Sequence, residues 1–218
     1  MKFAPLALAG FLTFAPAMAQ ACDTALILTI DVSNSVDLTE YRLQVDGLAD
    51  ALQDPEVRDT MVQGNTTIAV VQWSGPEKKA ISIPWTTVRT GLDVESLSRQ
   101  ARLIERAFVL SDTAPAEAIY FSMAMFDDVP FCARKVIDIS GDGPANAGGD
   151  VHTARSVAEQ SGVTINAIAI ESMGLAITNF FRNSVVTRDG FVMTARTHRE
   201  YPDTIRAKIL RELSRVLG

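Results

Sequence analysis

The most constraining stretch of this sequence is a short apolar run that stops at an acid followed by two hydroxyl groups. Residues 27–30 (Ile-Leu-Thr-Ile) are mostly β-branched, which favours a buried strand over a helix. Asp31, Ser33 and Ser35 follow at alternate positions, so three oxygen-bearing side chains share one tight loop at the strand's carboxyl end. Hard cations such as Mg²⁺ take ligands of this kind. Asp and Ser are also ordinary turn residues, so this loop alone does not define a metal site.

A second strand that ends beside an acid lies downstream. Residues 135–140 read as a strand, and the Gly-Asp-Gly-Pro turn at 141–144 contains Asp142. Between the two strands, Thr113 stands just ahead of a predicted helix that begins at Pro115. In this order, the three elements resemble the von Willebrand factor type A domain with its metal-ion-dependent adhesion site, which uses Asp-x-Ser-x-Ser, a distant Thr and a distant Asp. The resemblance spans nearly all of the mature chain. It is strongest to an uncharacterised secreted bacterial branch, which carries Ser-Gly-Asp-Gly-Pro after its fourth strand.

The resemblance implies a set of metal ligands and a way of binding. The ligands would be Asp31, Ser33, Ser35, Thr113 and Asp142, and the cation Mg²⁺, or Mn²⁺ or Ca²⁺ in its place. Three neutral hydroxyls and two carboxylates do not saturate such an ion, which keeps an open position. The expected partner is therefore a protein that presents a carboxylate to the metal.

Two further acids are candidates for the surroundings of the metal. Asp112 stands where the family usually has a glycine, and it would either add a carboxylate near the metal or point to solvent. Asp37 is a natural N-cap, with Glu40 three residues on as in a capping box, although its charge could instead support the cation. Thr113 has an alternative role as well, because it could simply cap the helix that follows.

The N-terminal residues predict export. Residues 1–19 read as a signal peptide, with Lys2 as the only charge, an apolar segment over 3–14 and small residues at 17–19. Cleavage after residue 21 is an alternative, and so is a lipid anchor on Cys22. No later stretch is long and apolar enough to span a membrane. The expected product is a periplasmic or extracellular domain of residues 22–218.

Strands and helices alternate along this domain. The pattern predicts an α/β fold with a doubly wound, mostly parallel sheet and helices on both faces, the three-layer von Willebrand A or Rossmann-like arrangement. The turn at 74–76 is too short for a parallel crossover, so the strand after it is expected to be an antiparallel edge strand. Helices are predicted at 38–52, 94–108, 115–126, 151–161, 177–183 and 205–217, and strands at 27–30, 66–73, 79–84, 135–140, 163–170 and 190–197.

If the strands follow the order typical of the resembling family, that order reverses between the first strand and the one ending at Ser140. Ligands bind at such a switch point, so Asp31 and Asp142 are expected to meet there. Cys22 and Cys132 each precede one of these two strands, which would bring both thiols to the opposite edge of the sheet. An exported protein meets an oxidising compartment, so a disulfide is predicted, with two unpaired buried thiols as the alternative.

Charge and motifs argue against several other functions. The net charge of −6 at pH 7, without a basic cluster, disfavours nucleic acid or an anionic membrane as a partner. No Gly-x-Ser-x-Gly elbow or Gly-Lys-Ser/Thr phosphate loop occurs, and Ser33 stands where an aspartyl phosphatase would need a second acid. His152 and His198 are interpreted as surface or capping residues. The sequence thus predicts a non-enzymatic, metal-dependent protein-binding module; the alternatives are a metal-dependent hydrolase and a domain that keeps the fold but binds no metal.

Overall fold

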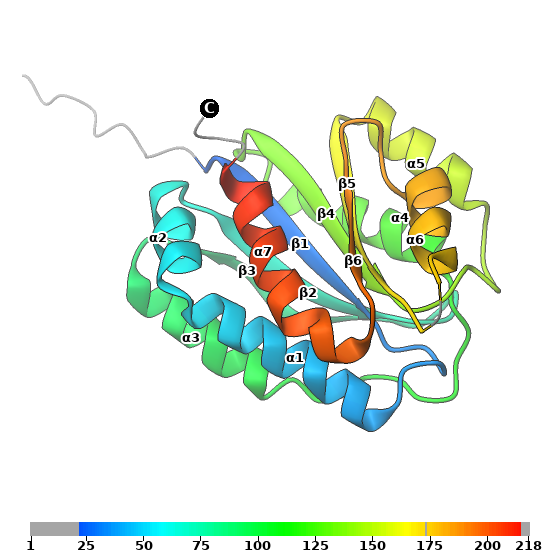
Figure 1. The fold of residues 1–218 in the computed structure, drawn as a ribbon. Helices are drawn as coiled ribbons and strands as arrows, with labels where there is room; N and C mark the ends of the chain where they lie inside the picture. Colours follow the sequence, from blue (N-terminus) through cyan, green and yellow to red (C-terminus); the bar gives the residue numbers. More distant parts are fainter. Residues whose placement is uncertain (1–21, 173, 215–218) are drawn as a thin grey trace, which may run out of the picture.

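The computed structural model describes residues 22–172 and 174–214 (Figure 1). The predicted signal peptide, residues 1–19, and the alternative cleavage position at residue 21 lie outside the described residues.

A twisted sheet forms the centre of the structure, with the strand order β3-β2-β1-β4-β5-β6. Its strands are β1 (Thr24–Asp31), β2 (Thr67–Trp73), β3 (Lys79–Thr87), β4 (Arg134–Gly141), β5 (Val163–Ile170) and β6 (Val192–Ala195). Neighbouring strands pair in parallel except β2 and β3, which are antiparallel. This confirms the predicted mostly parallel sheet with one antiparallel edge strand. β1 lies between β2 and β4, so the strand order reverses at β1 and β4 as predicted.

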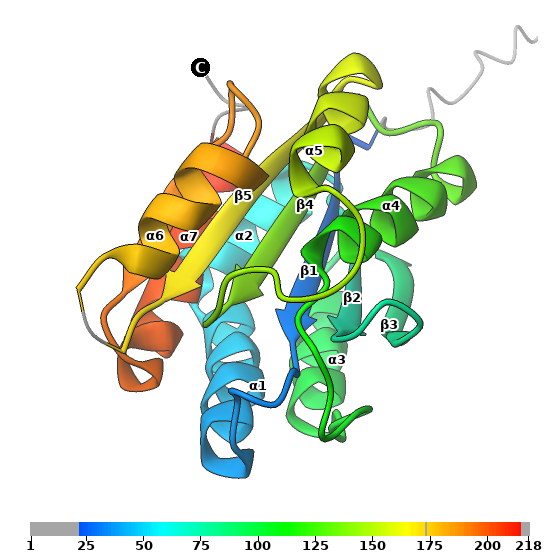
Figure 2. The same ribbon diagram turned by 90° about the vertical axis from the view of Figure 1, so that its right-hand side faces the viewer.

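Helices cover both faces of the sheet and make three layers (Figures 1 and 2). On one face lie α1 (Leu38–Gln53), α2 (Pro55–Gln63), α3 (Gly91–Arg102) and α7 (Tyr201–Ser214); on the other lie α4 (Pro115–Met125), α5 (Val151–Gln160) and α6 (Ala176–Phe180). Every residue of β1 is buried, and alternate side chains serve opposite faces. Leu26 and Leu28 belong to the core under α1 and α7, whereas Ala25 and Ile27 belong to the core under α4 and α5.

Two short segments differ from the helices predicted at the start of the chain. Leu38, the first residue of the helix predicted over 38–52, is 67% exposed, because the first turn of α1 extends past the ends of the strands (Figure 2). No helix was predicted directly after residue 52, but α2 begins at Pro55, and the side chain of Asp54 caps its first turn. Proline suits this first helical position because its missing N–H would lack an intrahelical partner there.

A third difference lies after α3, which ends at Arg102 and not at Phe108. The side chain of Gln72 on β2 takes the place of helical hydrogen bonds in this segment. Its amide nitrogen donates to the carbonyl of Glu105 (2.9 Å), and its amide oxygen accepts from the N–H of Ala107 (3.0 Å).

Cys22 and Cys132 form the predicted disulfide. It lies at the end of the sheet where β1 and β4 begin, and the N–H of Ala133 also donates to the carbonyl of Cys22 (2.9 Å). The bridge therefore fixes the starts of the two strands whose opposite ends carry the predicted metal ligands. Among the described helices, none combines the length and the apolar character that crossing a bilayer requires.

Candidate metal centre

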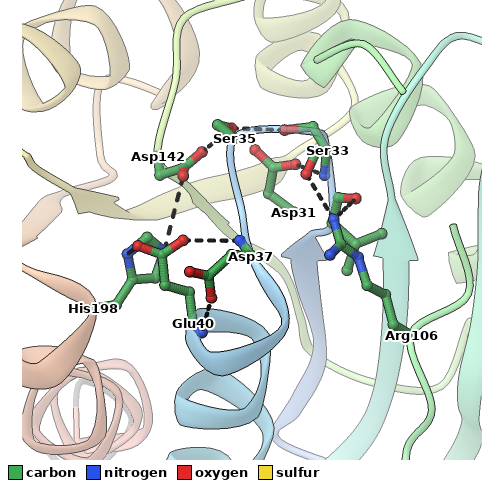
Figure 3. A network of polar contacts seen from close by, with 9 residues as sticks. Asp31, Ser33, Ser35, Asp37, Glu40, Arg106, Asp142 and His198 are labelled. Atoms are coloured by element: carbon green, nitrogen blue, oxygen red, sulfur yellow. Dashed lines mark hydrogen bonds and ion pairs between the residues drawn. The ribbon is translucent and has the colours of Figure 1, made fainter. Parts of the chain in front are cut away.

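The carboxyl ends of β1 and β4 bring the first and last elements of the predicted site together. The two strands pair in parallel with Ile30 opposite Ser140, so Asp31 and Asp142 leave the sheet at the same edge. The hydroxyl of Ser35 donates to Oδ1 of Asp142 over 2.5 Å, and the hydroxyls of Ser33 and Ser35 lie 3.1 Å apart (Figure 3). Segments more than a hundred residues apart in sequence thus contribute oxygen atoms to one small cluster.

Asp31 is the most deeply buried member of this cluster. Its Oδ1 accepts the N–H of Ser33 over 2.8 Å, but its Oδ2 is buried and accepts no hydrogen bond from the described residues. Burial and the charge of Asp142 raise the pKa of Asp31 to about 7. A Cβ at Gly141 would lie 3.1 Å from this free oxygen, so the glycine leaves room at the site. An orphaned carboxylate oxygen facing a second acid and two hydroxyls fits a hard divalent cation.

Thr113 lies in a loop that contacts both of these segments. The N–H of Asn34 donates to the carbonyl of Ser111 over 2.9 Å, which ties this loop to the serine loop. The N–H of Thr113 donates to Oδ1 of Asn146 (2.8 Å), and the N–H of Asn146 donates back to the carbonyl of Thr113 (3.0 Å). Thr113 is buried and Asp112 is exposed. Coordination by the Thr113 hydroxyl and support of the metal by Asp112 stay predictions.

Asp37 stands in the cap of α1. Its Oδ1 accepts the N–H of Glu40 over 2.8 Å, and its own N–H donates to Oε2 of Glu40 over 2.8 Å. This reciprocal pair is the capping box that the sequence predicts, and it holds the Glu40 carboxylate in place. An additional effect of the Asp37 charge on the cation stays a prediction.

Arg106 supports the serine loop, a contact that the sequence did not indicate. Its Nη2 donates to the carbonyls of Val32 (3.0 Å) and Ser33 (2.9 Å). Its positive charge also lowers the pKa of Asp31, against the larger effect of burial. Arg106 lies in the segment that was predicted to end a helix, and nothing in that segment's sequence indicates a contact with the serine loop.

We expect Arg106→Met to weaken divalent-metal binding about tenfold, because residues that orient metal ligands typically contribute 10- to 100-fold to affinity. The loop carbonyls lose their donor while the aliphatic packing is kept. Isothermal titration with Mg²⁺ measures the change. Arg102→Met is the matched control, since Arg102 pairs at the surface with Asp46 and Asp50. Equal weakening in both variants would contradict a specific role for Arg106.

His198 is a second residue whose place the sequence did not reveal. It was interpreted as a surface or capping residue, but it is only 9% exposed. It lies in a short 3₁₀ turn (His198–Glu200) that leads into α7, with Nδ1 3.1 Å from Oε1 of Glu40 and Nε2 3.9 Å from Oδ2 of Asp142 (Figure 3). Ser35, Glu40, Asp142 and His198 line a cavity of about 390 Å³. His198 is far from these residues in sequence, so spacing could not predict the contact.

This fold, with its oxygen-rich loops at the switch point, is that of a von Willebrand factor type A-like domain. Proximal thread matrix protein 1 from the mussel byssus superposes with a TM-score of 0.66 at 19% identity, over 88% of this chain and 48% of that one. A structure of the same mussel protein, described as having a zinc-occupied metal-ion-dependent adhesion site, gives 0.60 at 16% identity, over 87% and 46%. BatB from Bacteroides thetaiotaomicron gives 0.62 at 14% identity, over 88% and 99%. The chain thus spans about half the length of the mussel protein.

The chain belongs to the family described as "Protein of unknown function (DUF1194)", whose model matches residues 21–217. A comparison with curated proteins gives no match. The three structures named above, each below 25% identity, show the fold of this chain.

Proposed function

We propose that this protein is a divalent-metal-dependent protein-binding module whose cation accepts an acidic group from a partner. The observation that carries the proposal is the free Oδ2 of Asp31, buried beside Asp142 and the serine hydroxyls. Two carboxylates held this close repel each other, and burial raises the pKa of both. A divalent cation would relieve this repulsion and satisfy the orphaned oxygen.

The proposed ligands are Asp31, Ser33, Ser35, Thr113 and Asp142. Oxygen ligands favour Mg²⁺, Mn²⁺ or Ca²⁺. The hydroxyls carry no charge, so an external carboxylate completes both the coordination and the charge balance. The mussel protein is described with zinc at its metal-ion-dependent adhesion site, which supports a divalent cation at the matching place in this fold.

Exposed apolar side chains beside the metal loops support a protein partner. Leu38 follows the serine loop directly, and Val109 and Leu110 precede Ser111, whose carbonyl bonds to Asn34. Leu110 is 83% exposed and has φ of +50°, a left-handed conformation that costs an L-residue about 1 kcal/mol. The buried cores of protein interfaces are enriched in apolar residues, so these exposed side chains beside the metal loops suit a contact with a protein.

The domain is proposed to act outside the cytoplasm, in the periplasm or beyond the cell. The disulfide supports this, because such bonds persist in oxidising compartments. The proposed role is binding and not catalysis. Metal-dependent turnover of a generic phosphate ester would instead favour the hydrolase alternative.

The test is affinity capture from the exported fraction, with the immobilised chain in Mg²⁺ or in a chelator. We expect specific proteins to be retained in Mg²⁺ and released by the chelator, because the cation forms part of the contact. Asp142→Ala is the matched variant and should retain none of them in either condition. Retention of the same proteins by this variant, or in the presence of the chelator, would contradict the proposal.

A further inference from the structure

His198 holds a buried ring nitrogen, Nε2, on the side that faces Asp142. Its Nδ1 lies 3.1 Å from Oε1 of Glu40, a normal distance for an N–H donated to a carboxylate. In the neutral ring this bond places the proton on Nδ1 and leaves a lone pair on Nε2. Nε2 is buried and makes no hydrogen bond with the described residues. The nearest acid is Asp142, whose Oδ2 lies 3.9 Å away, too far for a direct hydrogen bond.

The gap between Nε2 and Oδ2 is slightly wider than the separation of two ligands on one tetrahedral transition-metal ion. Bonds of about 2.0–2.1 Å to imidazole and about 2.0–2.2 Å to a carboxylate place the two ligand atoms about 3.3 Å apart at a tetrahedral angle, and about 4.2 Å apart when collinear. The observed 3.9 Å between His198 and Asp142 lies between these two values, so the two atoms would have to approach by about 0.6 Å to bind one tetrahedral ion. The adjoining cavity of about 390 Å³ leaves space for water ligands.

Asp142 faces two different groups with its two oxygens. Oδ1 accepts the hydroxyl of Ser35 on the side of Asp31, whereas Oδ2 faces His198 (Figure 3). Glu40 is fixed behind the imidazole ring, because its other oxygen accepts the N–H of Asp37 in the capping box. A carboxylate that holds the far N–H of a histidine is the usual support of a histidine metal ligand.

We propose that His198 and Asp142 form a second cation subsite, which selects divalent transition metals such as Zn²⁺ or Co²⁺. His198 Nε2 and Asp142 Oδ2 are the protein ligands, Glu40 is the positioning residue, and water completes the shell. Imidazole suits Zn²⁺ and Co²⁺ but not Mg²⁺ or Ca²⁺, so the subsite differs in metal class from the oxygen-only centre at Asp31. Asp142 bridges the two. The subsite does not use Asp31 and therefore goes beyond the proposed function.

The test is calorimetric titration of the metal-free full chain with Zn²⁺ in saturating Mg²⁺. We expect the wild type to bind one equivalent of Zn²⁺ in one step. His198→Gln removes the imidazole ligand and should weaken the affinity for this Zn²⁺ at least 100-fold. Glu40→Gln keeps an acceptor for Nδ1 but loses its charge, so it should weaken the step about 10-fold. His152→Gln is the matched control, because His152 is the other histidine of the chain and lies exposed on α5.

Two further measurements separate this inference from the proposed function. Asp31→Asn removes the oxygen-only centre and should keep the zinc step. X-ray absorption of the zinc-loaded wild type, which involves no mutation of the buried ring, should show one imidazole in the zinc shell. Unchanged zinc binding in His198→Gln, loss of the step in Asp31→Asn, or an imidazole-free zinc shell would each overturn the subsite.

Discussion

The variant Asp31→Asn is expected to lose Mg²⁺ binding by at least 100-fold and to be more stable than the wild type when both are metal-free at pH 8. Asparagine keeps an oxygen that can accept the N–H of Ser33, so the loop is retained. The substitution removes the buried negative charge of Asp31, including the Oδ2 atom that accepts no hydrogen bond from the described residues. The raised pKa of Asp31, about 7 against an ordinary 3.8, corresponds to about 4 kcal/mol of lost stability once the group is ionised.

The same shift sets the pH dependence of the metal-free protein. Because the folded-state pKa of Asp31 is raised, its contribution to stability is fully present below about pH 4 and is lost as the pH rises through about 7. Metal binding has the opposite dependence, since the cation must displace the proton. Its affinity should fall about tenfold for each pH unit below about 7. In Asp31→Asn the fall in stability between pH 4 and 7 should be reduced.

Urea denaturation in chelator at pH 5 and pH 8, together with Mg²⁺ titration, measures both effects. Asp150→Asn is the matched control, in the exposed N-cap of α5, where the side chain accepts the N–H of Thr153. Asparagine caps helices as well as aspartate does, so metal affinity and stability should change little. If the metal-free wild type is equally stable at pH 5 and pH 8, ionising Asp31 costs the fold nothing, and the metal interpretation loses its main support.

Much of the fold could be predicted because its signals are local. The β-branched runs of β1 and β5 read as buried strands, and the three-residue turn before β3 allowed only an antiparallel pairing. The end of α3 could not be predicted in this way. Its apolar spacing continues to Phe108, but the distant side chain of Gln72 offers the backbone of Glu105 and Ala107 a competing set of hydrogen bonds. Tertiary contacts override a periodic pattern at such points.

The candidate site divides in the same way. Asp31, Ser33, Ser35 and Asp142 could be singled out because they lie in short motifs at strand ends, where the topology of a parallel sheet brings them together. Arg106 and His198 could not. Each lies in a segment whose own sequence contains no metal-binding pattern. Folding brings the side chain of Arg106 to the carbonyl of Val32 and that of His198 to Asp142.

A buried charge cluster lies behind the site, between α7 and the sheet. Lys208 on α7 is 0% exposed, with Nζ 2.5 Å from Oδ1 of Asp138 and 2.6 Å from Oε1 of Glu212. Asn166 on β5 donates to the same Glu212 oxygen over 2.9 Å. Burial and the charge of Glu212 raise the pKa of Asp138. The Lys208 ammonium contacts both acids and offsets part of their buried charge.

We expect Lys208→Met to lower the free energy of unfolding by about 3–5 kcal/mol, the usual result of removing one partner of a buried ion pair. Methionine fills most of the space, so the loss arises from the two uncompensated acids and not from a cavity. The cluster also connects α7 to β4, four residues before Asp142, and loosening it should weaken Mg²⁺ binding in the folded variant. Urea denaturation and calorimetry measure the two effects.

A compensated variant decides whether charge is the cause. Lys208→Met combined with Asp138→Asn and Glu212→Gln removes all three charges with little change of volume, and it should recover most of the lost stability, because neutral replacements of buried ion clusters are often tolerated. Lys78→Met, at the turn between β2 and β3, controls for the substitution itself and should change stability by less than about 0.5 kcal/mol. If the compensated variant is no more stable than Lys208→Met alone, the lysine acts through its packing. The position of α7 beside the metal centre would then depend on packing and not on the buried charges.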